Sequence, residues 1–269
     1  MSSSTSHPTP SAHQEAFIEK TIKDVKDKHF APIMVYPFDN DYISWGSMPP
    51  DISKYYLKPL LIMAPHLNFP NVDVFCSVCK DGVLVPKGLD PVRRYIHDLK
   101  YGFYLIQYKY SCGNKHCRRN NERLVACSLL NEWPDYLRLA YGKIHLTHTS
   151  GISDDTLSLI LHDAMSSKSF EEVGKTIAEF RVNYYVRLKT AYYTAVDCHI
   201  KMRQNEARLR REASLVGEIN YPVFSSMDDI SGFNEVPQPS NDYIIALYIS
   251  EYLFYPFLRR SHSCLTYYY

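Results

Sequence analysis

The sequence predicts an α+β fold from three observations. Short runs of aromatic and β-branched residues between positions 74 and 127 are typical of strands. Two closely spaced cysteine pairs lie within the same stretch. Between positions 170 and 213, apolar residues recur at helical intervals. We therefore expect a small cysteine-bearing module of short antiparallel strands, packed against a mainly helical C-terminal part.

The composition is that of a folded protein without a strongly charged surface. Its 269 residues are 45% hydrophobic, which is enough to build a sizeable core. The 30 basic and 29 acidic residues nearly cancel, so any nucleic-acid surface must be local. No glycine-rich phosphate loop occurs, and we expect no nucleotide cofactor. Because neither a secretory signal nor a long apolar run is found, we expect no membrane span and a nuclear or cytoplasmic location.

The N-terminal quarter predicts little regular structure. Residues 1–13 are rich in Ser, Thr and Pro and are predicted to form a disordered tail. Residues 14–73 combine a short amphipathic helix, Gln14 to His29, with a proline-rich segment. The prolines break regular elements, while the aromatic residues among them favour packing. We expect this segment to wrap a neighbouring body.

Residues 74–127 contain the strongest chemical signal in the chain. Val83–Val85 and Gly102–Tyr110 are predicted strands. Two residues separate the first pair of cysteines and four separate the second, with turn-forming residues beside or within each pair. A tetrahedral zinc ion needs four soft ligands, and two such knuckles supply them. The predicted zinc ligands of this four-cysteine zinc ribbon are Cys76, Cys79, Cys112 and Cys117.

Other interpretations of the cysteines stay open. They could be reduced core residues, or the first pair could be a redox motif, although no thioredoxin-like pattern surrounds it. His116 or Cys127 could replace Cys117 as the fourth ligand. Zinc binding contributes about 10–16 kcal/mol in such sites, comparable with the whole stability of a domain, about 5–15 kcal/mol. We therefore expect the module not to hold without its metal.

Basic and aromatic residues surround the cysteines. Ten Lys and Arg between positions 80 and 123 outnumber four acidic residues, and tyrosines lie among them. This mixture suits phosphate contact and base stacking, although aromatic residues of a strand also fill a core. We predict weak DNA binding of low sequence specificity. The residues expected to bind nucleic acid are Lys87, Arg93, Arg94, Lys109, Lys115, Arg118 and Arg119.

Residues 128–213 are predicted to be mainly helical. Ser153 precedes two aspartates at one expected helix start, and Ser169 with Glu172 has the spacing of a capping box at another. We expect the second pattern to run as a long helix with a break near Asn183. Its part from Arg181 to Arg211 has eight basic residues against two acidic ones, which suits an acidic protein partner.

Residues 214–269 are predicted to form an acidic linker and a C-terminal helix. The stretch 214–258 has six acidic residues and neither Lys nor Arg. The basic helix could therefore pair with this acidic tail instead of a separate partner.

Candidate catalytic groups are weaker, and we predict that the chain is not an enzyme. His145 and His148 would face opposite sides of a short strand. Cys198 and His199 are adjacent in a helical pattern and do not face each other. Asp197 lies in an apolar run, as the first metal carboxylate of an RNase H-type nuclease does on a buried strand, but the flanking periodicity is helical.

Several stretches share a pattern with a known family. They are KPLLIMAPHLNFP at 58–70, FCSVCKDGVLVPKG at 75–88, the aromatic strand before the second cysteine pair, LTHTSGISDDTLSLIL at 146–161 and the segment at 237–248. Together they resemble a functionally uncharacterised domain that precedes the catalytic domain of DDE-type transposases in eukaryotic mobile elements. The resemblance implies that the chain ends before that catalytic domain and has none of its transferase residues.

These observations lead to one expected function and one alternative. The expected function is a non-catalytic, transposon-derived, zinc-stabilised nucleic-acid-binding module, from the N-terminal region of a truncated transposase. The alternative is a structural protein-interaction domain whose zinc site serves folding alone.

Overall fold

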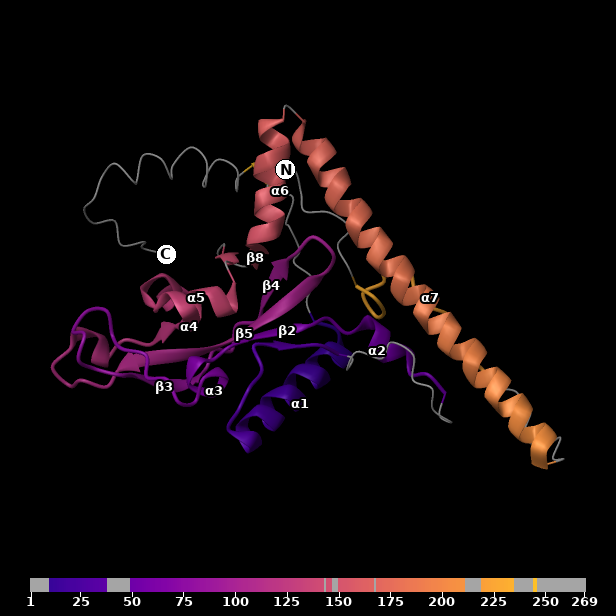
Figure 1. Cartoon of the computed structure of the whole chain (residues 1–269), viewed down its shortest axis with the longest axis horizontal. Helices are drawn as coiled ribbons and strands as arrows, with labels where there is room; N and C mark the ends of the chain where they lie inside the picture. The colour runs from indigo at the N-terminus through magenta and orange to yellow at the C-terminus, as the bar shows by residue number, and fades with distance from the viewer. Residues whose placement is uncertain are drawn as a thin grey trace.

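The fold in the computed structural model is built around one long strand, β5 (Gly102–Cys112), which is buried along nearly its whole length. Figure 1 shows this strand running through the body of the molecule, with helices on both sides of it. The structure describes residues 10–37, 49–142, 144–146, 150–166, 168–210, 219–234 and 244–245.

The described elements mix helices and strands, as predicted. The remaining strands are β1 (Met34–Val35), β2 (Leu60–Met63), β3 (Leu84–Leu89), β4 (Arg94–His97), β6 (Leu124–Val125), β7 (Ile144–Leu146) and β8 (Ser150–Ser153). The α-helices are α1 (Ala12–Lys28), α2 (Ile52–Tyr56), α3 (Pro65–Asn68), α4 (Ala126–Leu129), α5 (Asp135–Tyr141), α6 (Asp154–Met165) and α7 (Phe170–Arg210). Two 3₁₀ turns, η1 (Arg118–Asn120) and η2 (Leu130–Glu132), complete the set.

The two halves of β5 have different partners within one eight-stranded sheet. Its first half pairs with β2 in parallel and with β4 in antiparallel orientation, in the order β1-β2-β5-β4-β8-β7. Its second half pairs with β3 and β6, both antiparallel. β2 comes from the segment predicted to wrap the body, so that segment contributes a central, fully buried strand. The strands next to the cysteines are thus continuous with the main sheet.

Helices cover both faces of the first half of β5. Successive strand residues point to opposite faces, and the packing follows this alternation. Tyr104 and Ile106 pack in one cluster with Ile18 of α1. Leu105 belongs to a second cluster with Leu137 of α5. This two-sided burial fixes the first half of β5, and the same strand continues into the cysteine region.

The two predicted helix starts in the C-terminal part are confirmed. The Ser153 hydroxyl accepts a hydrogen bond from the backbone N–H of Thr156 at 3.3 Å, at the start of α6. Before α7, the backbone N–H of Ser169 donates to the Glu172 carboxylate at 2.8 Å, and that of Glu172 donates to the Ser169 hydroxyl at 3.2 Å. This reciprocal pair is a capping box.

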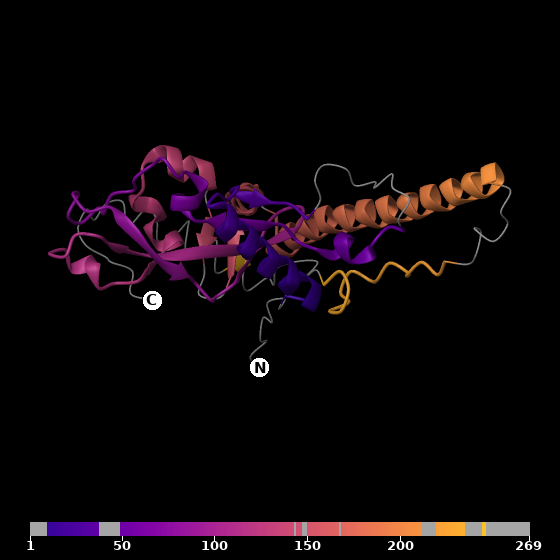
Figure 2. The same cartoon turned by 90° about the horizontal axis from the view of Figure 1, so that it is seen from below.

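Helix α7 is continuous over 41 residues, and the break predicted near Asn183 is absent. At 1.5 Å per residue it is about 60 Å long, and Figures 1 and 2 show it projecting far beyond the sheet. Residues 219–234 return beside it. The Tyr185 and Tyr192 hydroxyls of α7 donate to backbone carbonyls of this returning segment at 2.7 and 2.8 Å.

The ends of the chain lie largely outside the described residues. Of the predicted disordered tail 1–13, residues 1–9 lie outside them, while Ser11 caps α1 and the helix begins at Ala12. Of the predicted C-terminal helix, only residues 244–245 are described, and both are helical. Among the described residues, no helix is both long and apolar enough to span a membrane.

The first residue of β5, Gly102, leaves no space for a side chain. A Cβ atom at Gly102 would lie 1.7 Å from the Tyr95 hydroxyl oxygen, and Tyr95 is only 2% exposed. We expect Gly102→Ala to lower the free energy of unfolding by about 1–3 kcal/mol, because the buried ring must move. Urea unfolding would measure this, with Lys87→Ala on exposed β3 as a control expected within about 0.5 kcal/mol of the parent. Equal stability of both variants would contradict this packing.

Candidate metal centre

The four predicted cysteines converge at the far end of β5. The sulfur atoms of Cys76, Cys79, Cys112 and Cys117 all lie within 4.8 Å of one another. The Cys76 and Cys117 sulfurs are 3.9 Å apart, and those of Cys79 and Cys112 are 3.5 Å apart. Metal–sulfur bonds of about 2.3 Å in a tetrahedron give sulfur–sulfur edges of about 3.8 Å. The cluster could therefore hold one metal ion.

The first knuckle is a tight turn that requires glycine at its end. The Lys80 backbone N–H donates to the Cys76 carbonyl at 2.8 Å, with Lys80 at a φ of 62°. The Gly82 N–H points at the Cys79 sulfur, 3.4 Å away. A Cβ at Gly82 would lie 2.4 Å from the Cys112 sulfur. Only glycine lets the two knuckles approach this closely.

The second knuckle begins where β5 ends and is tied to the first by backbone hydrogen bonds. The Gly113 N–H donates to the Val83 carbonyl at 2.9 Å. The Asn114 N–H points at the Cys112 sulfur at 3.4 Å, and the Asn120 side-chain amide donates to the Cys112 carbonyl at 2.8 Å. N–H groups aimed at sulfur favour the thiolate form that binds metals.

The local environment shifts the pKa values of two of the thiols in opposite directions. The Gly82 N–H lowers the pKa of Cys79 to about 7. Burial raises the pKa of Cys112 to about 12. A metal ligand must be deprotonated, so a metal that binds here releases the Cys112 proton. Metal binding at this cluster is therefore linked to pH.

A carboxylate outside the cluster joins the two knuckles. Glu132 of η2 accepts from the Ser77 hydroxyl at 2.5 Å, and from two guanidinium nitrogens of Arg119 at 2.5 and 3.0 Å. Ser77 belongs to the first knuckle and Arg119 follows the second. The hydrogen bond from Arg119 lowers the pKa of Glu132. We call these three residues the Glu132 clasp; no local sequence signal pointed to it, because Glu132 is distant from Ser77 in the chain.

The two alternative fourth ligands lie outside the cluster. His116 is exposed, and its backbone N–H donates to the Asn114 side chain at 2.9 Å. Cys127 donates its backbone N–H to Gln107 at 3.2 Å. Cys117 completes the four-sulfur group instead.

The seven basic residues predicted to bind nucleic acid fall into different environments. Three form ion pairs: Arg93 with Glu15 at 3.2 Å, Lys109 with Asp90 at 3.2 Å, and Arg119 with Glu132 at 2.5 Å. Arg94 is half-buried on β4. The others are exposed, form no ion pair with any described residue, and are named here the basic trio: Lys87, Lys115 and Arg118.

The interleaved tyrosines of this region belong to the core. Tyr95, Tyr104, Tyr108 and Tyr110 are at most 9% exposed. These four rings fill the core, which is the alternative that the sequence left open, and they are not available for base stacking; Tyr101 is half-buried. Phe75, beside the first ligand, is 53% exposed, and no sequence pattern marks it as a surface residue.

Only some of the basic residues of the predicted basic helix are exposed. Its first residue, Arg181, is fully buried and donates to the Asp98 carbonyl at 3.1 Å. Arg187, Arg208 and Arg210 are exposed farther along α7. Its last predicted residue, 211, lies outside the described residues.

The weaker catalytic candidates do not form a site among the described residues. Asp197 lies on α7, exposed, and pairs with Lys201 at 2.6 Å. The buried-strand carboxylate of a nuclease is therefore the wrong interpretation of Asp197. His145 binds Asp154 at 2.9 Å, whereas His148 lies outside the described residues.

Comparison with protein-family models, with curated proteins and with solved structures found no match to the chain. The transposase resemblance therefore stays a prediction.

The metal centre predicts a specific mutational and pH pattern. Cys112→Ser should abolish stoichiometric metal binding and unfold the knuckles, because a structural site contributes about 10–16 kcal/mol. Cys127→Ser is the matched control and should bind normally. The apparent affinity should fall from about pH 8 to about pH 6, since protons compete for the thiolates. Metal content by elemental analysis and competition with a chelator would measure both. A pH-independent affinity, or retained binding in Cys112→Ser, would contradict the assignment.

The Glu132 clasp makes a separate prediction. Glu132→Gln should cost about 1 kcal/mol of stability at pH 7, as expected for a partly exposed, doubly hydrogen-bonded ion pair. Because the pKa of Glu132 is lowered in the folded state, its contribution is complete above the ordinary Glu pKa of about 4.3. It is lost as the pH falls through the lowered value. Denaturant titrations of both proteins across this range should converge at low pH; a constant difference would rule out the ion pair as the cause.

Proposed function

We propose that the chain is a non-catalytic, zinc-stabilised nucleic-acid-binding module, related to the region ahead of the catalytic domain in DDE-type transposases. The observation that supports this most directly is the four-cysteine cluster together with three exposed basic residues, Lys87, Lys115 and Arg118, that form no ion pair with any described residue. The cluster supplies the rigidity and the basic trio supplies the charge.

Zinc is the metal that this ligand set suits best. Four thiolates in a tetrahedral arrangement are typical of structural zinc sites, in which no coordination position is left for a substrate. The residues that would hold the ion are Cys76, Cys79, Cys112 and Cys117. A closed site of this kind acts through folding, in line with a non-catalytic role.

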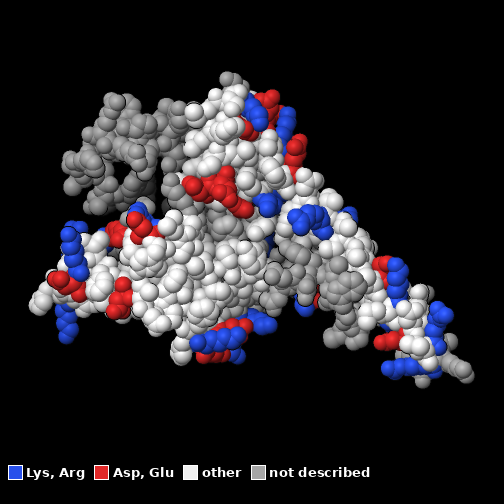
Figure 3. Space-filling model, in the orientation of Figure 1, with Lys and Arg blue, Asp and Glu red and all other residues white. Residues whose placement is uncertain are grey.

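The surroundings of the metal site support contact with a nucleic-acid backbone. Lys115 lies between the ligands of the second knuckle and Arg118 follows the last one, while Lys87 lies on β3 beside β5. Figure 3 shows basic side chains at the end of the molecule beyond β3, next to acidic ones. Such mixed charge gives weak, salt-sensitive binding. Exposed Phe75 adds one ring on which a base can stack regardless of its identity.

A protein-interaction role is the second candidate, and the outer part of α7 favours it. Exposed apolar residues Val186 and Ile200 lie on this helix with exposed Arg187 and Arg208. Figure 3 shows basic side chains toward the projecting end, with acidic ones among them. In this alternative an acidic protein binds α7 and the zinc site only maintains the fold.

Charge reversal would distinguish the two functions. The zinc-loaded full chain is titrated with a fluorescent DNA oligonucleotide at several salt concentrations. Each phosphate contact contributes about 0.9 to the slope of log affinity against log salt for duplex DNA. Lys115→Glu with Arg118→Glu should weaken binding and reduce the slope by about 2.

Lys23→Glu with Lys26→Glu on α1 is the matched control, since both residues are exposed and belong to another element. It should leave the slope unchanged. Absence of salt-sensitive binding by the parent protein, or an equal loss in both double variants, would refute the proposed nucleic-acid surface.

A further inference from the structure

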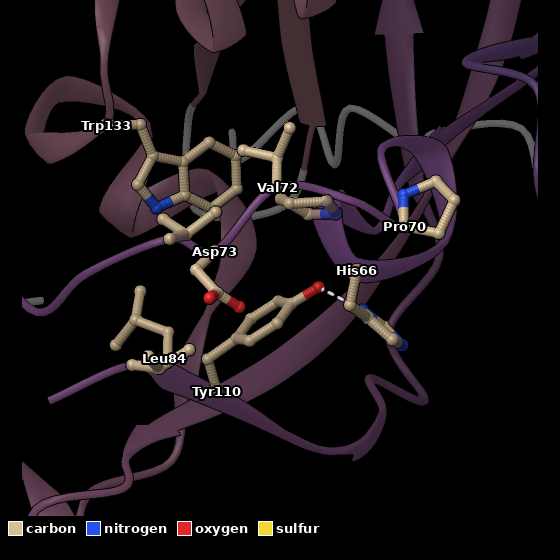
Figure 4. A pocket seen from close by; sticks show the side chains of 10 residues that line it. His66, Pro70, Val72, Asp73, Leu84, Tyr110 and Trp133 are labelled. Carbon is tan, nitrogen blue, oxygen red and sulfur yellow. Dashed lines mark hydrogen bonds between the residues drawn. The ribbon is translucent and has the colours of Figure 1, made fainter.

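The pocket beside the first knuckle is too small to bind an organic ligand. His66, Tyr110 and Trp133 are among the residues that line it (Figure 4), and its volume is about 90 Å³. A cavity that holds a benzene ring has a volume of about 150 Å³. The His66 Nδ1 atom and the Tyr110 hydroxyl, which are 2.7 Å apart, satisfy each other at its wall. The exterior of the molecule, along α7, offers a larger surface.

One side of α7 has a row of exposed apolar residues. We call Val182, Val186, Tyr193 and Ile200 the apolar stripe; each is between 37% and 50% exposed. Their intervals of four and seven residues place them on the same side of a helix. Tyr192, one residue away, is fully buried and belongs to a different side. Because α7 projects beyond the sheet (Figure 1) and these side chains are exposed, a second helix can reach them.

Charged residues extend the apolar stripe in both directions at heptad intervals. Glu172 and Glu179 precede Val186 by fourteen and seven residues, and both are exposed. Arg203 and Arg210 follow the stripe, twenty-one and twenty-eight residues after its first member; Arg203 is half-buried and Arg210 exposed. Residues at heptad intervals stay on the contact side when two helices wind around each other. The contact side of α7 is therefore acidic at its start, apolar in the middle and basic at its end.

We propose that this side of α7 binds the same side of α7 in a second copy of the chain, with the two helices antiparallel. Such a pair has a two-fold axis near residue 191 of each helix. Glu179 of one copy then lies opposite Arg203 of the other, and Glu172 lies opposite Arg210. Because the axis relates the two copies, every such contact occurs twice. The inference is independent of nucleic-acid binding.

The middle of the contact is apolar apart from one lysine. The facing pairs there are Val182 with Ile200, Val186 with Val196, and Lys189 with Tyr193. Two of these pairs are apolar, and their removal from water favours association. In the third pair an ammonium group can lie over an aromatic ring, which attracts it. Lys189 already lies in this way near Tyr185 of its own helix, 5.8 Å from the ring centre.

The charges select the orientation and the partner. A parallel pair in register would bring Glu179 opposite Glu179 and Arg203 opposite Arg203, and like charges repel. An acidic protein would suit the basic end of α7 but would face Glu172 and Glu179 at the other end. Lys175, on the same side, is paired with Glu171 at 2.7 Å and does not offset them. A second antiparallel copy is the partner that matches both ends.

The test measures the mass of the zinc-loaded full chain in solution by sedimentation, without nucleic acid. The monomer has a mass of 31.3 kDa, and we expect the parent to approach twice this value as its concentration rises. Val186→Ser with Ile200→Ser removes four apolar side chains from the dimer contact, and should weaken dimerisation about a hundredfold. Both positions are exposed in the monomer, so folding is not at risk.

Charge exchange tests the antiparallel arrangement. Glu179→Arg and Arg203→Glu, each alone, should weaken dimerisation about tenfold, because each turns two attractive contacts into repulsive ones. The double variant has opposite charges across the axis again and should dimerise about as tightly as the parent. Arg187→Glu is the matched control and should leave the dimer unchanged, since Arg187 is exposed on another side of α7.

Three outcomes would overturn the inference. They are a parent protein that stays monomeric at every concentration, a dimer that tolerates loss of Val186 and Ile200, and a charge-exchanged double variant that associates no better than the two single variants. Each of them would leave the proposed function standing, because binding of DNA is measured in a separate titration.

Discussion

The backbone hydrogen bonds of β5 join the two parts of the described sheet. One continuous strand pairs with β2 and β4 in its first half and with β3 and β6 in its second. It ends at Cys112, a member of the sulfur cluster. Since both faces of the first half are covered by helices, the strand cannot slide or tilt without exposing buried rings. The position of the Cys112 sulfur is therefore set by packing far from the cluster.

This arrangement explains why a metal would be stabilising here. Four sulfurs lie close together, and burial opposes ionisation of at least one of them, Cys112. Several thiolates at such distances would repel one another without a cation. A divalent ion removes that repulsion and joins two knuckles that otherwise touch through the Gly113–Val83 hydrogen bond and the Glu132 clasp. A bound metal would thus complete a structure that the sheet has already brought near its final geometry.

Local chemistry was predictable from the sequence, and long-range pairing was not. The capping residues Ser153, Ser169 and Glu172 act within one helical turn, so spacing alone identified them. The two cysteine pairs were predictable for the same reason, because each pair lies within one short turn. The parallel pairing of β2 with β5 joins segments about forty residues apart. Because β2 lies among prolines, the sequence predicted an irregular segment there instead of a strand. The role of the tyrosines depended on whether a second helix layer covered them, which no local pattern reveals.

The path of the chain around α7 has a mechanical consequence. The helix leads outward and residues 219–234 come back along it, with the Lys58 ammonium donating to the Phe233 carbonyl at 3.1 Å near the body. The contacts that fasten the returning segment involve Tyr185, Tyr192 and His199, one after another along the helix. A pull on the outer end would load these bonds in series, so they would open one by one, beginning at His199. Residues 219–234 would therefore separate from α7 gradually under force.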